Sequence, residues 1–386
     1  MANEEFLPFS RPTIDEATIQ EVTECLRSGW LATGPRVQKF EAALRDYLDA
    51  PHALTVMSAT SGLHLALLAL GIKPGDEVIT TSLTFVATLN VIAAVGAKPV
   101  LVEIDPKTLN IEVNHLRDAI TPNTRAIMPV HYAGLPVNLD EIYKIAEEYN
   151  LRVIEDAAHA MGASYKGKRI GSFGDIQVFS FHPNKNMTTI EGGCVVARDE
   201  EFIKTFNLYR FHGINKEAWN RFSKNGSQLY DVMLPGLKSN MSDVQAAVGI
   251  HQLAKLDEFN NRRRELAQRY HDALSSNPAL SLPISPKDHD GHAWHLYCVG
   301  INPEHTSFTR DTLMSALKER GIGLGLHYQA THLFTYYQNQ FAYKQGDFPL
   351  TESVCERIMS LPLFPTLTDA QQDRVIATLN ELLPVQ

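Results

Sequence analysis

The amino-acid sequence predicts an α/β protein with a large domain around a mostly parallel sheet and a smaller α+β domain at the C-terminal end. From about residue 15 to 255, short β-branched runs alternate with helical stretches, as in parallel strands joined by helices. A chain of 386 residues is long enough for one large and one small unit. Hydrophobic residues make up 44% and charged residues 20%, so a sizeable core can be buried.

Seven segments have strand character, because each is short, largely apolar and bounded by turn or capping residues. They are Ala53–Met57, Glu77–Thr80, Pro99–Ile104, Ala126–Val130, Arg152–Glu155, Ile176–Ser180 and Gly193–Ala197. Helical patterns lie between most of them, and Thr60–Leu70 carries its leucines and Ala66 at helical spacing. In sheets of this kind, ligands bind beyond the C-terminal ends of the strands. Functional side chains are therefore expected in the loops that follow them.

The C-terminal part is expected to begin on a long polar helix over Leu253–Tyr270. This helix would connect a large domain, residues 13–255, to a small domain, residues 256–386, with residues 1–12 packing near the small domain. HAWHLYCVGI (292–301) would form a strand, Thr309–Arg320 a helix, and a last helix would follow SLPLFP (360–365).

Composition disfavours several classes of protein. The net charge of −9 does not provide the basic surface that nucleic acid requires. The four cysteines, Cys25, Cys194, Cys298 and Cys355, are far apart, so neither a zinc site nor an iron–sulfur cluster is expected, and no metal. No run approaches the ~18 apolar residues of a membrane span, and the N-terminus has no signal-peptide pattern. We expect a cytoplasmic protein without a membrane partner.

A lysine and an acid stand at the ends of two predicted strands. Lys185 lies in the loop of FSFHPNKNMTTIEGG (179–193), and Asp156 ends the run VIED (153–156). Pyridoxal 5′-phosphate (PLP) needs such a pair, because the acid keeps its pyridine nitrogen protonated while the lysine binds its aldehyde and moves protons. Taken alone, Lys185 could be a surface lysine and Asp156 a helix N-cap.

Two more segments suit a phosphorylated, flat cofactor. Residues 58–62, Ser-Ala-Thr-Ser-Gly, turn a strand into a helix, where free backbone N–H groups and hydroxyls can bind a phosphate. An ordinary capped helix would look the same. Phe85, in TTSLTFVATLN (80–90), follows another strand and could stack on a ring or pack in the core.

Together the motifs resemble the DegT/StrS family of PLP-dependent sugar aminotransferases. The matching segments are SGWLATGP (28–35), SATSGLH (58–64), GDEVITTSLTFVATLN (75–90), PVHYAGLPVNLD (129–140), IEDAAHAMGA (154–163), FSFHPNKNMTTIEGG (179–193), LKSNMSDVQAA (237–247) and ERGIGLGLHY (319–328). They extend over nearly the whole chain. The resemblance implies the fold-type I, aspartate-aminotransferase-like architecture, with a seven-stranded sheet in the large domain.

The resemblance also implies roles for individual residues. Lys185 would bind PLP and shuttle protons, Asp156 would pair with the pyridine nitrogen, and His159 would lie beside the ring. Further cofactor contacts are implied for Ala59, Thr60, Ser61, Phe85, Ser180 and, reaching into the neighbouring subunit of a homodimer, Asn240. Sugar-nucleotide contacts are implied for Thr33, His327, Tyr328 and His332.

Within the family, FLPFSRP, VHYAG, EDAAHA, HAWHL, KERGIGLGLH and SLPLFP most resemble the UDP-4-amino-4-deoxy-L-arabinose–oxoglutarate aminotransferases. The implied reaction moves an amino group from L-glutamate, leaving 2-oxoglutarate, to a nucleotide-linked 4-keto sugar, here a UDP-4-keto pentose. Phe85 replaces the tryptophan of that group, and Ala330 replaces a proline of many relatives, so a UDP-4-keto-6-deoxy hexose stays open. The remaining alternatives are a PLP-dependent sugar dehydratase, which Lys185 and the lack of a cysteine cluster disfavour, and a non-enzymatic regulator on the same fold.

Overall fold

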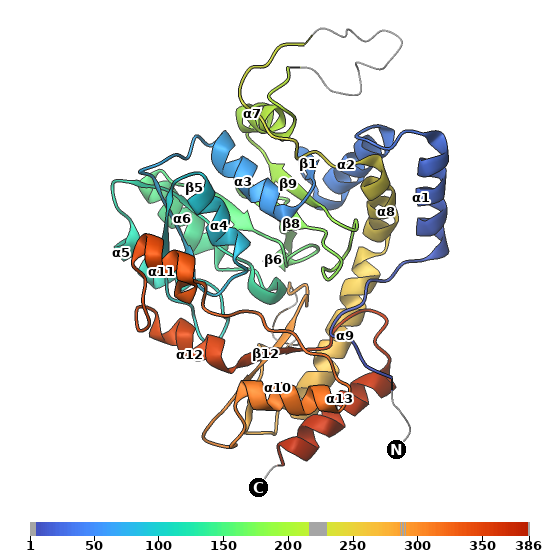
Figure 1. Cartoon of the computed structure of the whole chain (residues 1–386), viewed down its shortest axis with the longest axis vertical. Helices are drawn as coiled ribbons and strands as arrows, with labels where there is room; N and C mark the ends of the chain where they lie inside the picture. The colour runs from blue at the N-terminus through green and yellow to red at the C-terminus, as the bar shows by residue number, and fades with distance from the viewer. Residues whose placement is uncertain (1–4, 216–229, 286, 288, 290, 385–386) are drawn as a thin grey trace.

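A seven-stranded sheet lies at the centre of the larger part of the molecule (Figure 1). The computed structural model describes residues 5–215, 230–285, 287, 289 and 291–384. The strands are β1 (His52–Val56), β2 (Glu77–Thr81), β3 (Lys98–Val102), β4 (Thr124–Ile127), β5 (Arg152–Asp156), β8 (Ile176–Ser180) and β9 (Gly193–Ala197). Their order is β1-β9-β8-β5-β4-β2-β3. Only the two ladders of β9 are antiparallel, which confirms the predicted, mostly parallel sheet.

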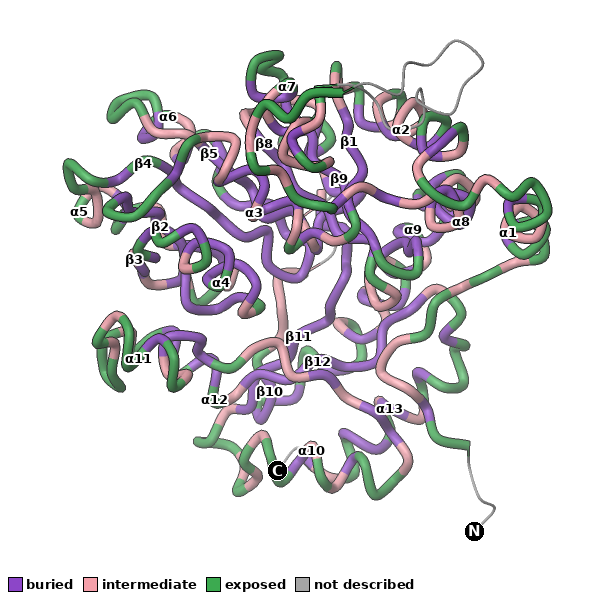
Figure 2. The backbone as a smooth tube through the Cα atoms, turned by 45° about the horizontal axis from the view of Figure 1, so that its top comes forward, coloured by how far each residue is buried: buried purple, intermediate pink, exposed green. Residues whose placement is uncertain are grey.

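Helices cover both faces of this sheet. They are α2 (Pro35–Leu48), α3 (Ala59–Ala69), α4 (Ala87–Ala94), α5 (Leu116–Ala119), α6 (Leu139–Tyr149), α7 (Glu200–Arg210) and α8 (Asp243–Ala254), while α1 (Glu16–Ser28) packs against α8. Successive residues of β9 alternate between two cores: Cys194 packs with α2, α6 and α8, and Val195 with α3, α4 and α7. This alternation follows from the two-residue period of a strand. Figure 2 shows the central strands buried, as expected for a sheet covered on both faces.

The C-terminal part is built on a small antiparallel sheet of β10 (Leu280–Ser281), β11 (Tyr297–Ile301) and β12 (Ile358–Leu361). Its core combines side chains of α9 (Leu256–Leu274), α10 (Arg310–Glu319) and α13 (Asp369–Leu382). Leu7 joins this core and pairs with Ile322, so the start of the described chain packs here. Two helices, α11 (Thr335–Phe341) and α12 (Pro349–Arg357), extend towards α4 and β3 of the large sheet (Figure 1).

Two elements differ from the sequence-based expectation. The expected helix over Leu253–Tyr270 is interrupted at Lys255, where α8 ends and α9 begins. The expected strand over 292–301 begins only at Tyr297, because Trp294 has a left-handed backbone, with φ 49°, that a strand cannot contain. The domain division near residue 255 remains a prediction. No helix in the described part of the chain has both the length and the apolar character of a membrane crossing.

Candidate active site

A cavity of about 390 Å³ lies where β5 and β8 end and α3 begins. Asp156 is the last residue of β5, and Lys185 lies in the loop that connects β8 to β9. The segment Leu326–Tyr328, from the C-terminal part, contributes to the wall. The parallel order of the strands therefore brings the predicted acid and lysine to one edge of the sheet, where ligands bind in this fold class.

The carboxylate of Asp156 is buried and hydrogen-bonded on both oxygens. Oδ2 accepts from the Thr88 hydroxyl at 2.8 Å, and Oδ1 accepts from the backbone N–H of Ala158 at 3.2 Å. Thr88 in turn lies 2.7 Å from the hydroxyl of Thr84. Burial raises the pKa of Asp156, and the two hydrogen bonds oppose this effect. A cation placed beside this carboxylate would stabilise its charge.

The amine of Lys185 lies in the same cavity, 3.5 Å from Nε2 of His295. Burial lowers the pKa of Lys185 from 10.5 to about 8, and the negative charge of Asp156 limits the fall. A lysine with such a pKa has a substantial neutral fraction just above neutral pH. It can therefore act as a nucleophile and as a proton acceptor.

A wall of rings lies beside the lysine. Nδ1 of His159 accepts from the N–H of Ala133 at 3.2 Å, so its Nε2–H donates to the Tyr328 hydroxyl at 3.0 Å. Burial holds the pKa of His159 well below 6.5 and lowers that of His327 to about 4. Phe85 faces Tyr328 with ring centroids 5.9 Å apart and is 56% exposed. Its ring is therefore available to a flat ligand.

The N-terminus of α3 forms the third part of the cavity. Ser58 caps the helix by accepting from the N–H of Ser61 at 3.1 Å, and Ala59 and Thr60, the first two helical residues, line the cavity. Their N–H groups point out of the helix, where an anion is favoured. A Cβ on Gly193 would lie 2.8 Å from the amide nitrogen of Ala59, so a glycine is required for this close approach.

Most of the predicted site residues line this cavity. They are Ala59, Thr60, Phe85, Asp156, His159, Ser180, Lys185, His327 and Tyr328. Ser61 is adjacent, with its hydroxyl 3.1 Å from that of Ser58. An anion site, a buried carboxylate, an amine and an exposed aromatic ring are the groups that PLP requires. In the described residues, no group of three His, Cys, Asp or Glu side chains could hold a metal ion.

Thr33 and Asn240 lie together, but in a second cavity of about 410 Å³. The Asn240 amide donates to the hydroxyl of Thr33, which donates to the carbonyl of Met241 at 2.5 Å. Neither residue lines the cavity of Lys185 in the same chain.

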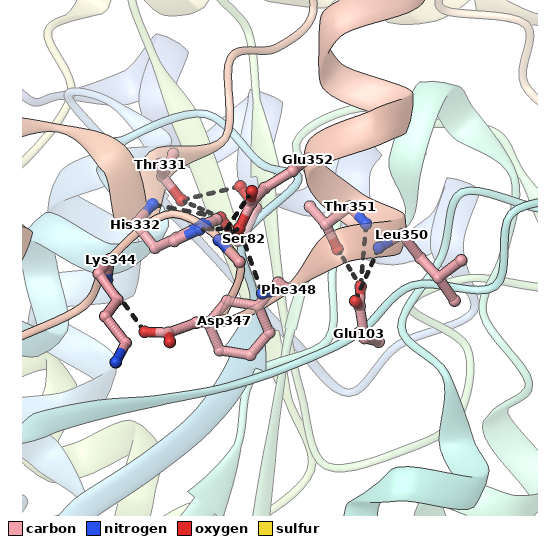
Figure 3. A network of polar contacts seen from close by, with 11 residues as sticks. Ser82, Glu103, Thr331, His332, Lys344, Asp347, Phe348, Leu350, Thr351 and Glu352 are labelled. Carbon is pink, nitrogen blue, oxygen red and sulfur yellow. Dashed lines mark hydrogen bonds and ion pairs between the residues drawn. The ribbon is translucent and has the colours of Figure 1, made fainter.

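His332 was expected to contact the sugar nucleotide, and it does not line the cavity of Lys185 in this structure. Its ring is fully buried, with Nδ1 2.7 Å from the Ser82 hydroxyl and Nε2 3.0 Å from Glu352 (Figure 3). Both nitrogens are therefore used within the protein. His332 connects the segment before α11 to the loop after β2 instead of facing a ligand.

Two residues of the site were not anticipated. Thr88 stands four residues after Thr84, a helical spacing that places both hydroxyls on one side, so the motif TTSLTFVATLN contained a usable signal. His295 was assigned to a strand, where it had no distinct role. Its position depends on the left-handed backbone of Trp294, which local sequence preferences do not predict.

Comparisons with known proteins agree with this geometry. The model of the DegT/DnrJ/EryC1/StrS aminotransferase family matches residues 12–380. The spore coat polysaccharide biosynthesis protein SpsC of Bacillus subtilis is 46% identical over 381 residues, 98% of this chain and 97% of SpsC. Helicobacter pylori PseC, an aminotransferase involved in the biosynthesis of pseudoaminic acid, superposes with a TM-score of 0.91 at 30% identity, covering 98% and 99% of the chains. NtdA of Bacillus subtilis, solved with bound cofactor PMP, gives 0.84 at 31%, covering 96% and 83%.

Proposed function

The chain belongs to the DegT/DnrJ/EryC1/StrS aminotransferase family, and on this premise we propose that it moves an amino group from L-glutamate to C4 of a nucleotide-linked 4-keto sugar. The protein is a PLP-dependent sugar aminotransferase. The observation that carries the proposal is the pairing of Asp156 and Lys185 in one cavity beside the free N-terminus of α3. When bound, PLP would supply an electron sink and would carry the amino group from the donor to the keto carbon.

Two residues carry the chemistry in this proposal. Asp156 would hold a proton on the pyridine nitrogen, and the hydrogen bonds from Thr88 and Ala158 favour the charged form of the carboxylate and orient it. Lys185 would hold the cofactor covalently and, as a free amine, would accept and return a proton at the reacting carbon of the substrate. A lysine with a pKa near 8 suits both tasks.

The remaining cavity residues bind and orient. Ala59, Thr60, Ser61 and Ser180 would hold the phosphate, with the positive end of the α3 dipole contributing. Phe85 would stack on one face of the ring, and His159 would lie beside the ring or its phenolic oxygen. His327 and Tyr328 would contact the sugar nucleotide from the C-terminal part, and a neutral His159, bonded to Tyr328, would help to orient that tyrosine.

The proposal includes a homodimer in which Thr33 and Asn240 act on the partner's cofactor and substrate. Apolar side chains that are 39% exposed or more lie near Asn240: Leu31, Met57 and Leu237. Their proximity follows from backbone contacts, since Met57 donates to Ser239 at 2.8 Å and the carbonyl of Leu31 accepts from Asp243 at 3.1 Å. Clustered, exposed apolar side chains favour an interface between subunits.

For the sugar, we propose a UDP-4-keto pentose, from the segments FLPFSRP, SLPLFP and GLGLHYQATH. The role of SpsC in spore coat polysaccharide biosynthesis supports an activated sugar in general and not a particular one. A 4-keto-6-deoxy hexose is the second candidate, because Phe85 and Ala330 depart from the pentose-specific pattern. A pocket that fits a pentose would exclude the additional methyl group of a 6-deoxy hexose by steric clash. A pocket that fits the hexose would accept the pentose, with a loss of only about 1–3 kcal/mol in transition-state binding energy.

The test is a glutamate-coupled assay of the purified protein over a panel of UDP- and dTDP-linked keto sugars. We expect the highest kcat/KM with the UDP-linked 4-keto pentose. A preference for a hexose would show that the sugar is a hexose and not a pentose, and would leave the proposed transamination at C4 standing. Activity on 3-keto sugars alone would overturn amination at C4. Borohydride treatment of the loaded protein should fix the cofactor to the Lys185 peptide, and a label on another lysine would overturn that assignment.

A further inference from the structure

The segment His292–Leu296 is hydrogen-bonded to the loop that contains Lys185 and to residues 133–134. The side-chain amide of Asn186, the neighbour of Lys185, donates to the carbonyl of Ala293 at 2.7 Å. The N–H groups of Ala293 and Leu296 donate to the carbonyls of Gly134 and Ala133 at 3.0 and 3.2 Å. These contacts fix the two loops relative to each other, so His295 keeps a defined position beside Lys185.

A buried cation shapes this segment. Arg263 of α9 is almost fully buried, and its guanidinium donates to the carbonyls of Trp294, His295 and Leu363 at 3.3, 3.2 and 2.8 Å. Burial lowers the pKa of Arg263 to about 10, so it remains charged. A tryptophan rarely adopts a left-handed backbone and does so only when its surroundings impose it. Arg263 stabilises this turn through the carbonyls of Trp294 and His295, and the turn leaves His295 beside Lys185.

The ring of His295 has the surroundings of a functional group. It is 98% buried against solvent and its centroid lies 4.4 Å from that of His159. Its Nε2 faces Nζ of Lys185 at 3.5 Å, while its Nδ1 has no hydrogen-bond partner in the described residues. Burial and the charge of Lys185 hold the pKa of His295 well below 6.5, so the ring is neutral.

We propose that His295 is a positioning residue of the reaction, which binds the amine of Lys185 whenever this amine is not bonded to the cofactor. The inference rests on the proposed function, since transamination releases this amine and later rebinds it. The ammonium group would donate to Nε2, a contact at the outer limit of hydrogen-bond distance here. Held in this way, a side chain with four rotatable bonds stays within reach of the substrate carbon.

The pKa of the Lys185 amine reports on this contact directly. The other groups that face it or its partner are Asp156, His159, His327, Tyr328 and Arg263, and none is changed in the experiment. The full-length protein, stripped of cofactor or loaded with pyridoxamine phosphate, is labelled with trace acetic anhydride over a range of pH. Mass spectrometry then gives the labelling of Lys185 relative to the exposed Lys168.

His295→Phe should lower the pKa of Lys185 by about one unit, because a charged group loses its hydrogen-bond acceptor. His295→Gln, whose amide reaches the Nε2 position, should preserve the wild-type pKa, and His295→Asn, which is too short, should behave like His295→Phe. The matched control is His251→Phe. His251 is partly buried and pairs with Glu21 at 3.6 Å, outside the cavity of Lys185, so its loss should leave the pKa of Lys185 unchanged.

An unchanged pKa in a folded His295→Phe protein would overturn the proposal, as would equal values for the Gln and Asn variants. If His295→Phe does not fold, the comparison of Gln with Asn decides alone. The measurement needs no sugar substrate, so its failure is distinguishable from a failure of the proposed reaction in the sugar panel.

Discussion

At Asp156, burial and hydrogen bonding have opposite effects on a single charge. A carboxylate this deeply buried favours its protonated form, and the hydrogen bonds from Thr88 and Ala158 favour the charged form. A protonated pyridine nitrogen would place a positive charge beside this carboxylate and so would stabilise its charged form. The same pairing would keep the ring able to accept electrons, so catalysis would depend on this contact.

Asp156→Asn should retain the cofactor but lower the single-turnover rate with glutamate by several powers of ten, equivalent to about 4 kcal/mol or more. An amide cannot keep the pyridine nitrogen protonated, although it fills the same space. Stopped-flow absorbance gives the rate and dialysis gives the retention. Asp175→Asn is the control, because Asp175 pairs with Arg152 at 2.6 Å outside the cavity and should leave turnover unchanged. Near-normal turnover of Asp156→Asn would refute the pairing.

Lys185 also affects the stability of the cofactor-free protein in a pH-dependent way. Its folded-state pKa is about 8, against 10.5 when unfolded, so the unfolded chain binds more protons between these values and stability rises with pH across this window. The buried charge of Lys185 lowers the free energy of unfolding by its full amount below about pH 8, and it has no such effect above about pH 10.5. The fall of the Lys185 pKa from 10.5 to about 8 corresponds to a loss of about 3 kcal/mol at most in the free energy of unfolding.

Lys185→Met should therefore unfold at higher urea concentration than the wild type at pH 7, both proteins being free of cofactor. The advantage should shrink as the pH approaches 10, because the lysine of the folded wild type is then neutral and little of the charge penalty remains. Urea midpoints at pH 7 and pH 10 provide the measurement. An advantage of equal size at both values would show that packing and not the charge of Lys185 is responsible.

At the scale of elements, buried polar contacts join α11 and α12 to the large sheet. Glu103, just after β3, accepts from the N–H groups of Leu350 and Thr351 at 2.9 Å and so caps α12 from a distant part of the sequence (Figure 3). His332 bridges Ser82 and Glu352 in the same region. These contacts hold the chain just after His327 and Tyr328, so they fix the wall of the cavity.

Glu103→Gln should destabilise α12 locally, by about 1–2 kcal/mol, because the helix loses a charged cap. Hydrogen exchange followed by mass spectrometry should show faster exchange in residues 349–357 and little change in the central strands. Glu201→Gln serves as the control, since Glu201 lies on the surface of α7 and its carboxylate pairs with Lys204 at 2.6 Å, away from α12. Unchanged exchange in α12 would mean that packing alone holds this helix.

The strands and most site residues could be predicted, because their signals are local. Each strand is a short apolar run, and Asp156 and Lys185 stand at recognisable strand ends. The environments of His295 and His332 could not, since each depends on contacts with residues far away in the sequence, Arg263 and Glu352. The local sequence around a histidine does not show whether its side chain contacts a ligand or bonds to a buried carboxylate.

At the scale of the whole molecule, the predicted site residues are divided between two cavities. Lys185 and Asp156 lie in one, while Thr33 and Asn240 lie in the other, next to exposed apolar side chains. A single chain would leave Asn240 without a role in cofactor binding. A symmetric dimer, in which the same surface of each subunit contacts the other, would place Asn240 of each chain at the partner's cofactor.

This arrangement can be tested by mixing two inactive variants. Lys185→Ala removes the catalytic amine, and Asn240→Asp places a negative charge where the partner's phosphate would lie, so each homodimer should be inactive. After subunits of both are exchanged, half of the dimers are mixed, and each mixed dimer has one site with both defects and one site with neither. Activity should return to about a quarter of the wild-type value. If Asn240 acts within its own chain, every site retains one defect and no activity returns. Sedimentation confirms that the mixture is dimeric, and a fully active monomeric wild type would exclude the shared site altogether.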